Sequence, residues 1–127
     1  DASRVGYTVR FAPGRHNIRA QIDGTTNTIS VSLRDGDAPH VVAHDIAHEV
    51  GHAYDQTHLT DADRRAYLVR RGVPDAVWLS EADSDYGVGA GDFAEVFALC
   101  HAASPDFRGT LAPRPENACE LLPQEAL

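Results

Sequence analysis

The chain has 127 residues, a hydrophobic content of 43%, a charged content of 24% and a formal net charge of −8. This length and composition are those of one globular domain spanning residues 1–127, and they argue against a disordered chain. The negative charge argues against a nucleic-acid or anionic-membrane partner, because both need clustered basic residues. The sequence has no run of about 18 apolar residues, so we expect no membrane-spanning segment.

Three strand-like segments come first along the chain. Alternation of apolar and polar residues predicts strands at 7–11, 17–22 and 28–33, and the Asp23-Gly24 step predicts a hairpin between the last two. We therefore expect a small antiparallel sheet. The residues expected to face its core include Ile18, Ile29, Val31 and Leu33.

Three helices are predicted after the strands. The first starts at Asp37, which has the features of an N-cap with proline in the following turn. Its Gly51 costs about 1 kcal/mol relative to alanine, so we expect another backbone to approach closely there. The second helix runs from about 61 to 71 behind a capping residue, and the third from about 92 to 103. The predicted class is α+β, with the sheet packed on the first helix and on a second, carboxylate-bearing helix.

The first helix carries His48-Glu49-Val50-Gly51-His52, a pentapeptide with H-E-x-x-H spacing. Residues four apart lie on the same face of a helix, so His48 and His52 can bind one tetrahedral metal ion. Glu49 lies beside this pair, where it can take a proton from a water in the open coordination position. The spacing is typical of zinc hydrolases and predicts one zinc ion.

The same helix offers an alternative histidine pair. His40, His44, His48 and His52 are each four residues apart, so His44 and His48 also share a face, with Asp45 in the position of the general base. Aspartate is shorter than glutamate and reaches less far toward a metal-bound water. We therefore expect His40 and His44 to lie at the surface or to support the site without binding the metal.

Two histidines leave a catalytic zinc one protein ligand short, and the third predicted helix offers carboxylates. The run from Asp92 to Phe97 resembles the glutamate helix of gluzincin metallopeptidases, in particular the minimal domains of the anthrax-lethal-factor and Pro-Pro endopeptidase type. Their motif is E-x-F-A-E, in which the first glutamate binds zinc and the second, four residues later, supports a histidine. Gly91 occupies the first position here, so the nearest carboxylate is Asp92, and Glu95 matches the second position.

The resemblance implies a zinc-dependent peptidase in which Glu49 activates water. Three arrangements of the carboxylates remain open. Either Asp92 is the third ligand and Glu95 hydrogen-bonds a zinc histidine, or Glu95 is itself the ligand. In the third arrangement, Asp92 and Glu95 only cap their helix and another group completes the site. The alternative function is a zinc-stabilised, catalytically inactive binding module derived from a peptidase.

Peptide hydrolysis by such enzymes usually also needs a hydrogen-bond donor for the developing oxyanion. The resembling families have a tyrosine seven residues before their zinc glutamate. Tyr86, in a glycine-flanked loop six residues before Asp92, is the candidate for this role.

The two cysteines, Cys100 and Cys119, lack the C-x-x-C spacing of a zinc site and predict a disulfide. Such a bond would stabilise the fold by about 3 kcal/mol. Together with a chain that begins at Asp1 without methionine, it predicts a secreted or extracytoplasmic protein. The expected partner is a peptide or protein substrate, with no nucleic acid and no membrane, and we expect a monomer.

Overall fold

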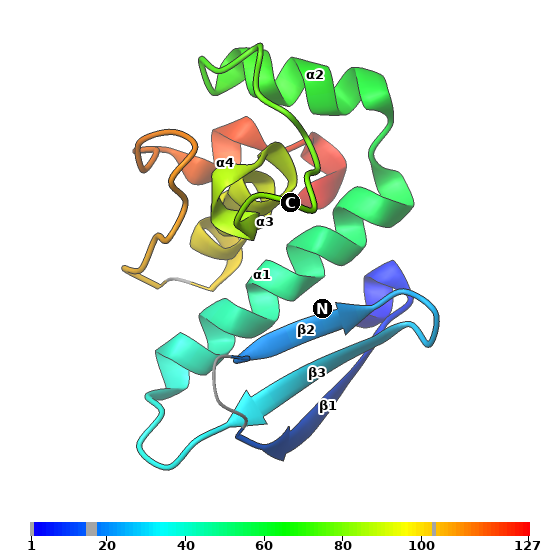
Figure 1. Cartoon of the computed structure of the whole chain (residues 1–127), viewed down its shortest axis with the longest axis vertical. Coiled ribbons are helices and arrows are strands. Elements are labelled where there is room, and N and C mark those ends of the chain that lie inside the picture. Colours follow the sequence, from blue (N-terminus) through cyan, green and yellow to red (C-terminus); the bar gives the residue numbers. More distant parts are fainter. Residues whose placement is uncertain (1, 15–17, 103) are drawn as a thin grey trace.

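Helix α1 (Pro39–His58) is the longest element and lies between a three-stranded sheet and helix α3 (Gly89–His101) (Figure 1). The computed structural model describes residues 2–14, 18–102 and 104–127. The sheet packs on one side of α1, and α3 packs on the other side. The predicted α+β class is therefore confirmed.

The sheet is mixed rather than wholly antiparallel. Its strands are β1 (Thr8–Pro13), β2 (Ala20–Asp23) and β3 (Thr28–Leu33), in the order β1-β3-β2. The predicted hairpin is present, since β2 runs antiparallel to β3 and the Asp23 carboxylate accepts hydrogen bonds from the turn backbone. The expectation for β1 was wrong: β1 pairs with the other edge of β3, and it runs parallel to that strand. β1 would be antiparallel only to β2, with which it does not pair.

The inward face of the sheet matches the predicted alternation in part. Ile29 and Val31 are fully buried, as expected, whereas Ile18 is 39% exposed and Leu33 is 41% exposed. Ile18 precedes the first residue of β2, and Leu33 is the last residue of β3, where the alternation has shifted because Val31 and Ser32 are both buried. The predicted strand at 17–22 begins with Asn17, which lies outside the described residues.

Helix α1 begins one residue later than predicted. Its N-cap is Ala38, without a side-chain hydrogen bond, and Pro39 is the first helical residue. The carboxylate of Asp37 instead accepts a hydrogen bond from the Arg34 backbone and pairs with Arg19, so it is not available to cap the helix.

Close contact between α1 and α3 explains the glycine inside the first helix. A Cβ at Gly51 would lie 2.8 Å from the Ala94 Cα, so only glycine allows the two backbones to come this close. The close approach expected at Gly51 is confirmed. This contact aligns the carboxylate-bearing part of α3 with the histidine-bearing part of α1.

Helix α2 (Asp61–Arg70) begins with the predicted cap, because Thr60 and Asp63 form a reciprocal capping box. Helix α3 begins at Gly89, three residues before its predicted start. Short elements complete the fold; they are η1 (Ala2–Val5), η2 (Asp85–Gly87), α4 (Ala118–Leu121) and η3 (Gln124–Ala126). The predicted disulfide joins Cys100 to Cys119 and so ties α3 to α4. None of the helices formed by the described residues is long and apolar enough to cross a membrane.

Candidate metal centre

The two histidines of the pentapeptide lie next to a carboxylate that comes from outside α1. The Nε2 atoms of His48 and His52 lie 3.1 Å apart. The Oδ2 atom of Asp85 lies 3.0 Å from the first and 3.2 Å from the second. The three ligand atoms thus form a nearly equilateral triangle, and the described part of the chain contains one such group.

The size of this triangle fits a bound zinc ion. Nitrogen and oxygen ligands lie about 2.0–2.2 Å from zinc, which places neighbouring ligands of a tetrahedral site about 3.3 Å from one another. The observed separations are close to that value. Two histidines and one carboxylate also make the set of three protein ligands that leaves a catalytic zinc one open position. These three residues could therefore hold a metal ion.

Asp85 reaches the histidines because residue 91 has no side chain. A Cβ on Gly91 would overlap the main chain of Asp85 and would lie 2.9 Å from its Cγ atom. Position 91 is the one at which the resembling peptidases carry their zinc glutamate. Here the space is filled by η2, and the carboxylate comes from that turn instead of from α3.

The sequence-based prediction overlooked Asp85. A ligand on an irregular loop has no periodic spacing by which to find it. The glycine at position 91 was the available signal, because it left the third arrangement open, in which another group completes the site.

The structure does not bring Asp92 to the histidine pair, which corrects the first predicted arrangement. Asp92 is fully buried, and its Oδ2 atom accepts hydrogen bonds from the Tyr67 hydroxyl at 2.6 Å and from Arg71 Nε at 2.7 Å. Its Oδ1 atom accepts a further bond from Arg71 Nη2 at 2.8 Å. Both oxygens therefore serve to join α3 to α2, and Asp92 makes no side-chain cap for its own helix.

Glu95 makes the contact that the resemblance predicted for a supporting carboxylate. Its Oε1 atom lies 2.8 Å from His48 Nδ1 and 3.1 Å from His44 Nε2, while its Oε2 atom accepts the backbone N–H of Arg108 at 2.6 Å. Burial raises the pKa of Glu95, but these three hydrogen bonds outweigh it and lower the pKa to about 2. The ionised carboxylate fixes the His48 ring so that Nε2 faces the triangle.

Hydrogen bonds around the histidine pair favour the ionised forms of His48 and Asp85. Burial lowers the pKa of His48, yet its hydrogen bonds to Asp85 and Glu95 raise it overall, to about 9. Burial also works against ionisation of Asp85, but its bonds to His48 and His52 hold the pKa of that carboxyl well below its usual range. Asp85 is therefore ionised at neutral pH and can act as an anionic ligand.

The alternative pair of His44 and His48 is not arranged as a metal site. The two rings converge on one oxygen of Glu95, and the other nitrogen of His44, the buried Nδ1, has no partner among the described residues. Asp45 is held in ion pairs with Arg108 and Arg19. His44 thus hydrogen-bonds Glu95 and supports the site through it, which is one of the two roles predicted for this histidine. His40 is exposed, as expected.

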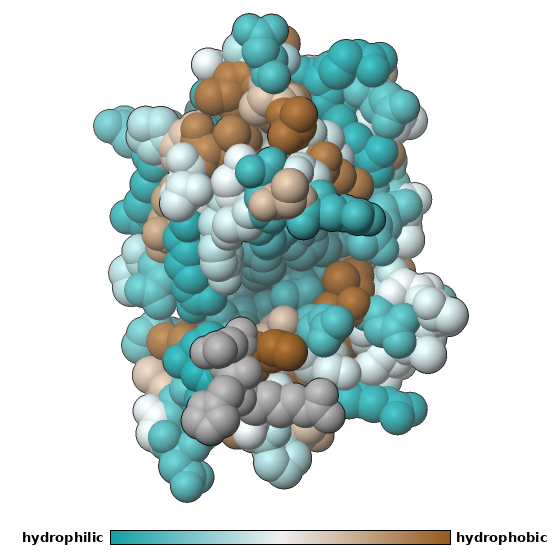
Figure 2. Space-filling view, viewed as in Figure 1, coloured by the Kyte–Doolittle hydropathy of each residue, from teal (hydrophilic) through white to brown (hydrophobic). Residues whose placement is uncertain are grey.

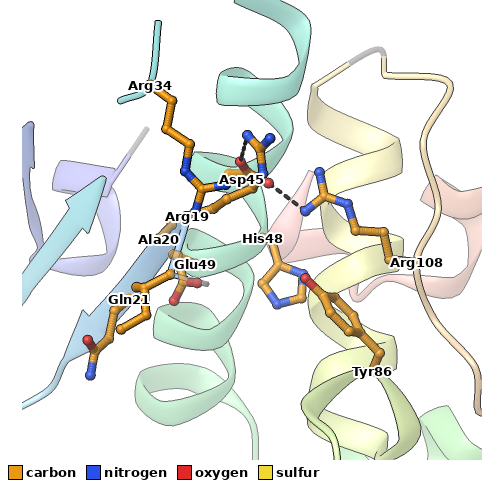
Figure 3. A pocket seen from close by; sticks show the side chains of 10 residues that line it. Arg19, Ala20, Gln21, Arg34, Asp45, His48, Glu49, Tyr86 and Arg108 are labelled. Atoms are coloured by element: carbon orange, nitrogen blue, oxygen red, sulfur yellow. Dashed lines mark hydrogen bonds and ion pairs between the residues drawn. The ribbon is translucent and has the colours of Figure 1, made fainter. Parts of the chain in front are cut away.

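Glu49 and Tyr86 border the open side of the triangle. Glu49 is 9% exposed, and burial raises the pKa of its carboxyl despite the nearby His48 and His52, which lower it. The Tyr86 ring centroid lies 5.6 Å from that of His48, and Figure 3 shows the two side chains next to each other. Both side chains line the cavities beside the histidines.

Two adjoining cavities of ≈490 and ≈410 Å³ form one cleft along α1. The residues that border both cavities are Ala20, Gln21, His48, Glu49 and Tyr86. Figure 2 shows the surface hollowed between the sheet and the helices above it, with hydrophilic residues in the hollow. The His48–His52–Asp85 triangle thus lies in the wall of the second cavity, and His48 also borders the first.

Comparison with protein-family profiles, curated proteins and solved structures finds no match to this chain. The metal centre therefore rests on the geometry of its own residues. That geometry comprises a histidine pair and a carboxylate at ligand spacing, beside a buried glutamate that orients one histidine.

Proposed function

We propose that this protein is a zinc-dependent peptidase whose metal is held by His48, His52 and Asp85. The observation that carries the proposal is the triangle of ligand atoms, with separations of 3.0–3.2 Å, next to the glutamate of an H-E-x-x-H pentapeptide. The sequence resemblance to gluzincins supports the same function, with the third ligand moved from α3 to η2. The disulfide supports the proposal that the enzyme is secreted and works outside the cytoplasm.

Zinc, when bound, supplies a Lewis acid that polarises the substrate carbonyl and lowers the pKa of a coordinated water. The chain's own residues then account for the proton movements. The Glu49 carboxylate takes a proton from the attacking water and later gives it to the leaving amine. Burial raises the pKa of Glu49 from its usual value, although the nearby His48 and His52 lower it, and a raised pKa suits a group that must both accept and donate a proton.

Tyr86 and Glu95 have different tasks in this mechanism. The Tyr86 hydroxyl, on the wall of the cleft, donates a hydrogen bond to the carbonyl oxygen as negative charge develops there. Glu95 touches no substrate, and it holds His48 in the orientation that presents Nε2. The proposed substrate is a peptide, and the two cavities that share His48, Glu49 and Tyr86 give it space beside the metal centre.

The proposal is tested with Glu49→Gln, assayed on an unstructured polypeptide together with zinc content. We expect the variant to keep zinc and to lose about 10²–10⁴-fold in hydrolysis, the range for loss of a general base. Glu81→Gln, at an exposed acidic residue outside the cleft, is the matched control and should keep full activity. Full activity in Glu49→Gln would refute the proposed mechanism. A wild-type protein that holds zinc and cuts no peptide would instead be the inactive binding module.

A further inference from the structure

A segment between α3 and α4 contacts three of the elements that surround the metal centre. Residues 104–113, here called the 104–113 loop, form neither helix nor strand, so contacts with other parts of the chain must hold them in place. Ser104 and Ala112, near the two ends of the loop, are buried. Between them, Arg108 and Thr110 form hydrogen bonds with α1, η2 and α3.

Arg108 supports the glutamate that orients His48. Its backbone N–H donates to Glu95 Oε2 at 2.6 Å, while the other oxygen of Glu95 lies 2.8 Å from His48 Nδ1. The carboxylate is therefore held at both oxygens and cannot turn without breaking its bond to the loop. Arg108 is itself fixed by its side chain, because Nη1 lies 2.6 Å from the buried Asp45 of α1 (Figure 3). The 104–113 loop thus helps to set the direction of the His48 ring.

Thr110 supports the turn that supplies the third ligand. Its backbone N–H and its hydroxyl both donate to the carbonyl oxygen of Tyr86, at 2.7 and 3.1 Å. Tyr86 follows Asp85 directly in η2, which is only three residues long. Such a short turn has few hydrogen bonds of its own, so bonds from outside matter for its position. The 104–113 loop therefore acts on Asp85 as well as on His48.

The disulfide encloses this loop. Cys100 lies near the end of α3 and Cys119 lies in α4, so the bond closes the chain on both sides of the 104–113 loop. A cross-link restricts the conformations open to the segment that it encloses. Cys119 is exposed, and both cysteines border a cavity of ≈360 Å³, so a reductant can reach the bond.

We infer that Arg108 and Thr110 are positioning residues of the metal centre and that the disulfide holds their loop in place, so that zinc affinity depends on oxidation of Cys100 and Cys119. The inference rests on the zinc site of the proposed function. A dithiol reductant would supply two electrons and two protons: the S–S bond breaks, both cysteines become thiols, and the sulfurs of the reductant join in a disulfide. The freed loop would then support Glu95 and η2 less well. The protein is thus expected to hold zinc tightly in oxidising surroundings and weakly in reducing ones.

The zinc affinity of a double variant, Cys100→Ser with Cys119→Ser, tests the role of the disulfide. Chelator competition measures the affinity, and serine replaces chemical reduction because thiols bind zinc themselves. We expect a fall of about 10–100-fold, the range for loss of groups that support a metal ligand. Ile29→Ala, at a fully buried residue of β3, is the control for lost stability. It should lower the urea midpoint and keep the zinc affinity of the wild type.

Substitutions in the loop test the two positioning residues. Arg108→Pro removes the backbone N–H, whereas Arg108→Ala removes the side chain and keeps that donor, so zinc affinity should be about tenfold lower in the proline variant. Thr110→Pro and Thr110→Ser give the same comparison, because serine keeps both donors. Arg114→Pro, at an exposed residue just beyond the loop, is the control for an added proline and should bind zinc like the wild type. Urea titration establishes that each variant folds, and either pair is sufficient for the comparison.

A combined variant shows whether the disulfide acts through the loop. When the two serines are added to Arg108→Pro, the total loss of zinc affinity should be at least about fivefold smaller than the product of the separate losses, because the two changes disturb the same contacts. Three results would overturn the inference: wild-type affinity in the serine variant, an equal loss in Ile29→Ala, or separate losses that multiply fully.

These outcomes are separate from failure of the proposed function, because zinc affinity is measured without substrate. If zinc affinity depends on the disulfide and the loop but the wild type hydrolyses no peptide, the inference stands and the peptidase does not. If peptides are hydrolysed and the serine variant binds zinc normally, the peptidase stands and the inference does not.

Discussion

The main chain of Asp85 occupies the space that a side chain on Gly91 would need. The resembling gluzincins place their third zinc ligand at position 91, on the helix that faces the histidines. In this protein a turn of 3₁₀ helix fills that space and brings its own carboxylate to within 3.2 Å of both histidine nitrogens. The two positions are therefore interdependent: Asp85 can serve the metal centre only while residue 91 is glycine.

Loss of the Asp85 carboxylate should remove zinc. In Asp85→Asn we expect zinc affinity to fall by more than the roughly 10–100-fold that is typical for a residue that only supports a ligand. Competition with a chromogenic chelator measures the change. Asp83→Asn, two residues earlier in the same exposed loop, is the control and should bind zinc like the wild type. Equal affinity in both variants would exclude Asp85 as a ligand.

A side chain at residue 91 should also lower zinc affinity, although residue 91 is not itself a ligand. Gly91→Ala must displace the Asp85 backbone, so we expect zinc affinity to fall even though no ligand has been changed. In Gly87→Ala, by contrast, the new Cβ would meet Thr110 Oγ1 at 3.5 Å, an ordinary contact. That variant should retain zinc, and chelator competition compares the two. Unaltered zinc binding in Gly91→Ala would show that Asp85 does not depend on this glycine.

Replacing Asp92 should lower the free energy of unfolding and leave zinc affinity unchanged. Its carboxylate joins Arg71 and Tyr67 in a buried network, and removing one member of a buried ion pair costs about 3 kcal/mol or more. We expect Asp92→Asn to lower the free energy of unfolding by about that amount in urea titrations and to keep wild-type zinc affinity. Asp61→Asn, which breaks an exposed pair with Arg64, should cost less than about 1 kcal/mol. Zinc loss in folded Asp92→Asn would restore Asp92 as a ligand.

Glu95 should affect zinc through His48. In Glu95→Gln the side chain keeps its shape but loses the charge that orients the Nδ1–H of His48, so zinc affinity should fall by about 10–100-fold. Isothermal titration with zinc measures this change. Glu116→Gln, at an exposed residue of the C-terminal tail, should bind zinc normally. If Glu95→Gln also bound zinc normally, the hydrogen bond to His48 would have no orienting role.

Features that depend on local sequence could be predicted. The H-E-x-x-H spacing placed His48, Glu49 and His52 on one part of a helix because helical periodicity is local. Gly51, inside that helix, correctly indicated a close approach of another backbone, and the two cysteines correctly indicated the disulfide.

Features that depend on contacts between distant segments could not be predicted from the sequence. Nothing local distinguishes Asp92 from a metal ligand, because Arg71 and Tyr67 lie 21 and 25 residues away on another helix. Asp85 lies on a turn whose position is set by Gly91 and α3. The parallel pairing of β1 likewise reflects which edge of β3 was free, and a strand pattern does not contain that information.

Zinc-edge anomalous diffraction from crystals grown with zinc tests the metal centre most directly. We predict one anomalous peak, about 2.0–2.2 Å from His48 Nε2, His52 Nε2 and a carboxylate oxygen of Asp85. A peak bound by Asp92, a peak between His44 and His48, or no peak at the triangle in zinc-saturated crystals would contradict the assignment of this site.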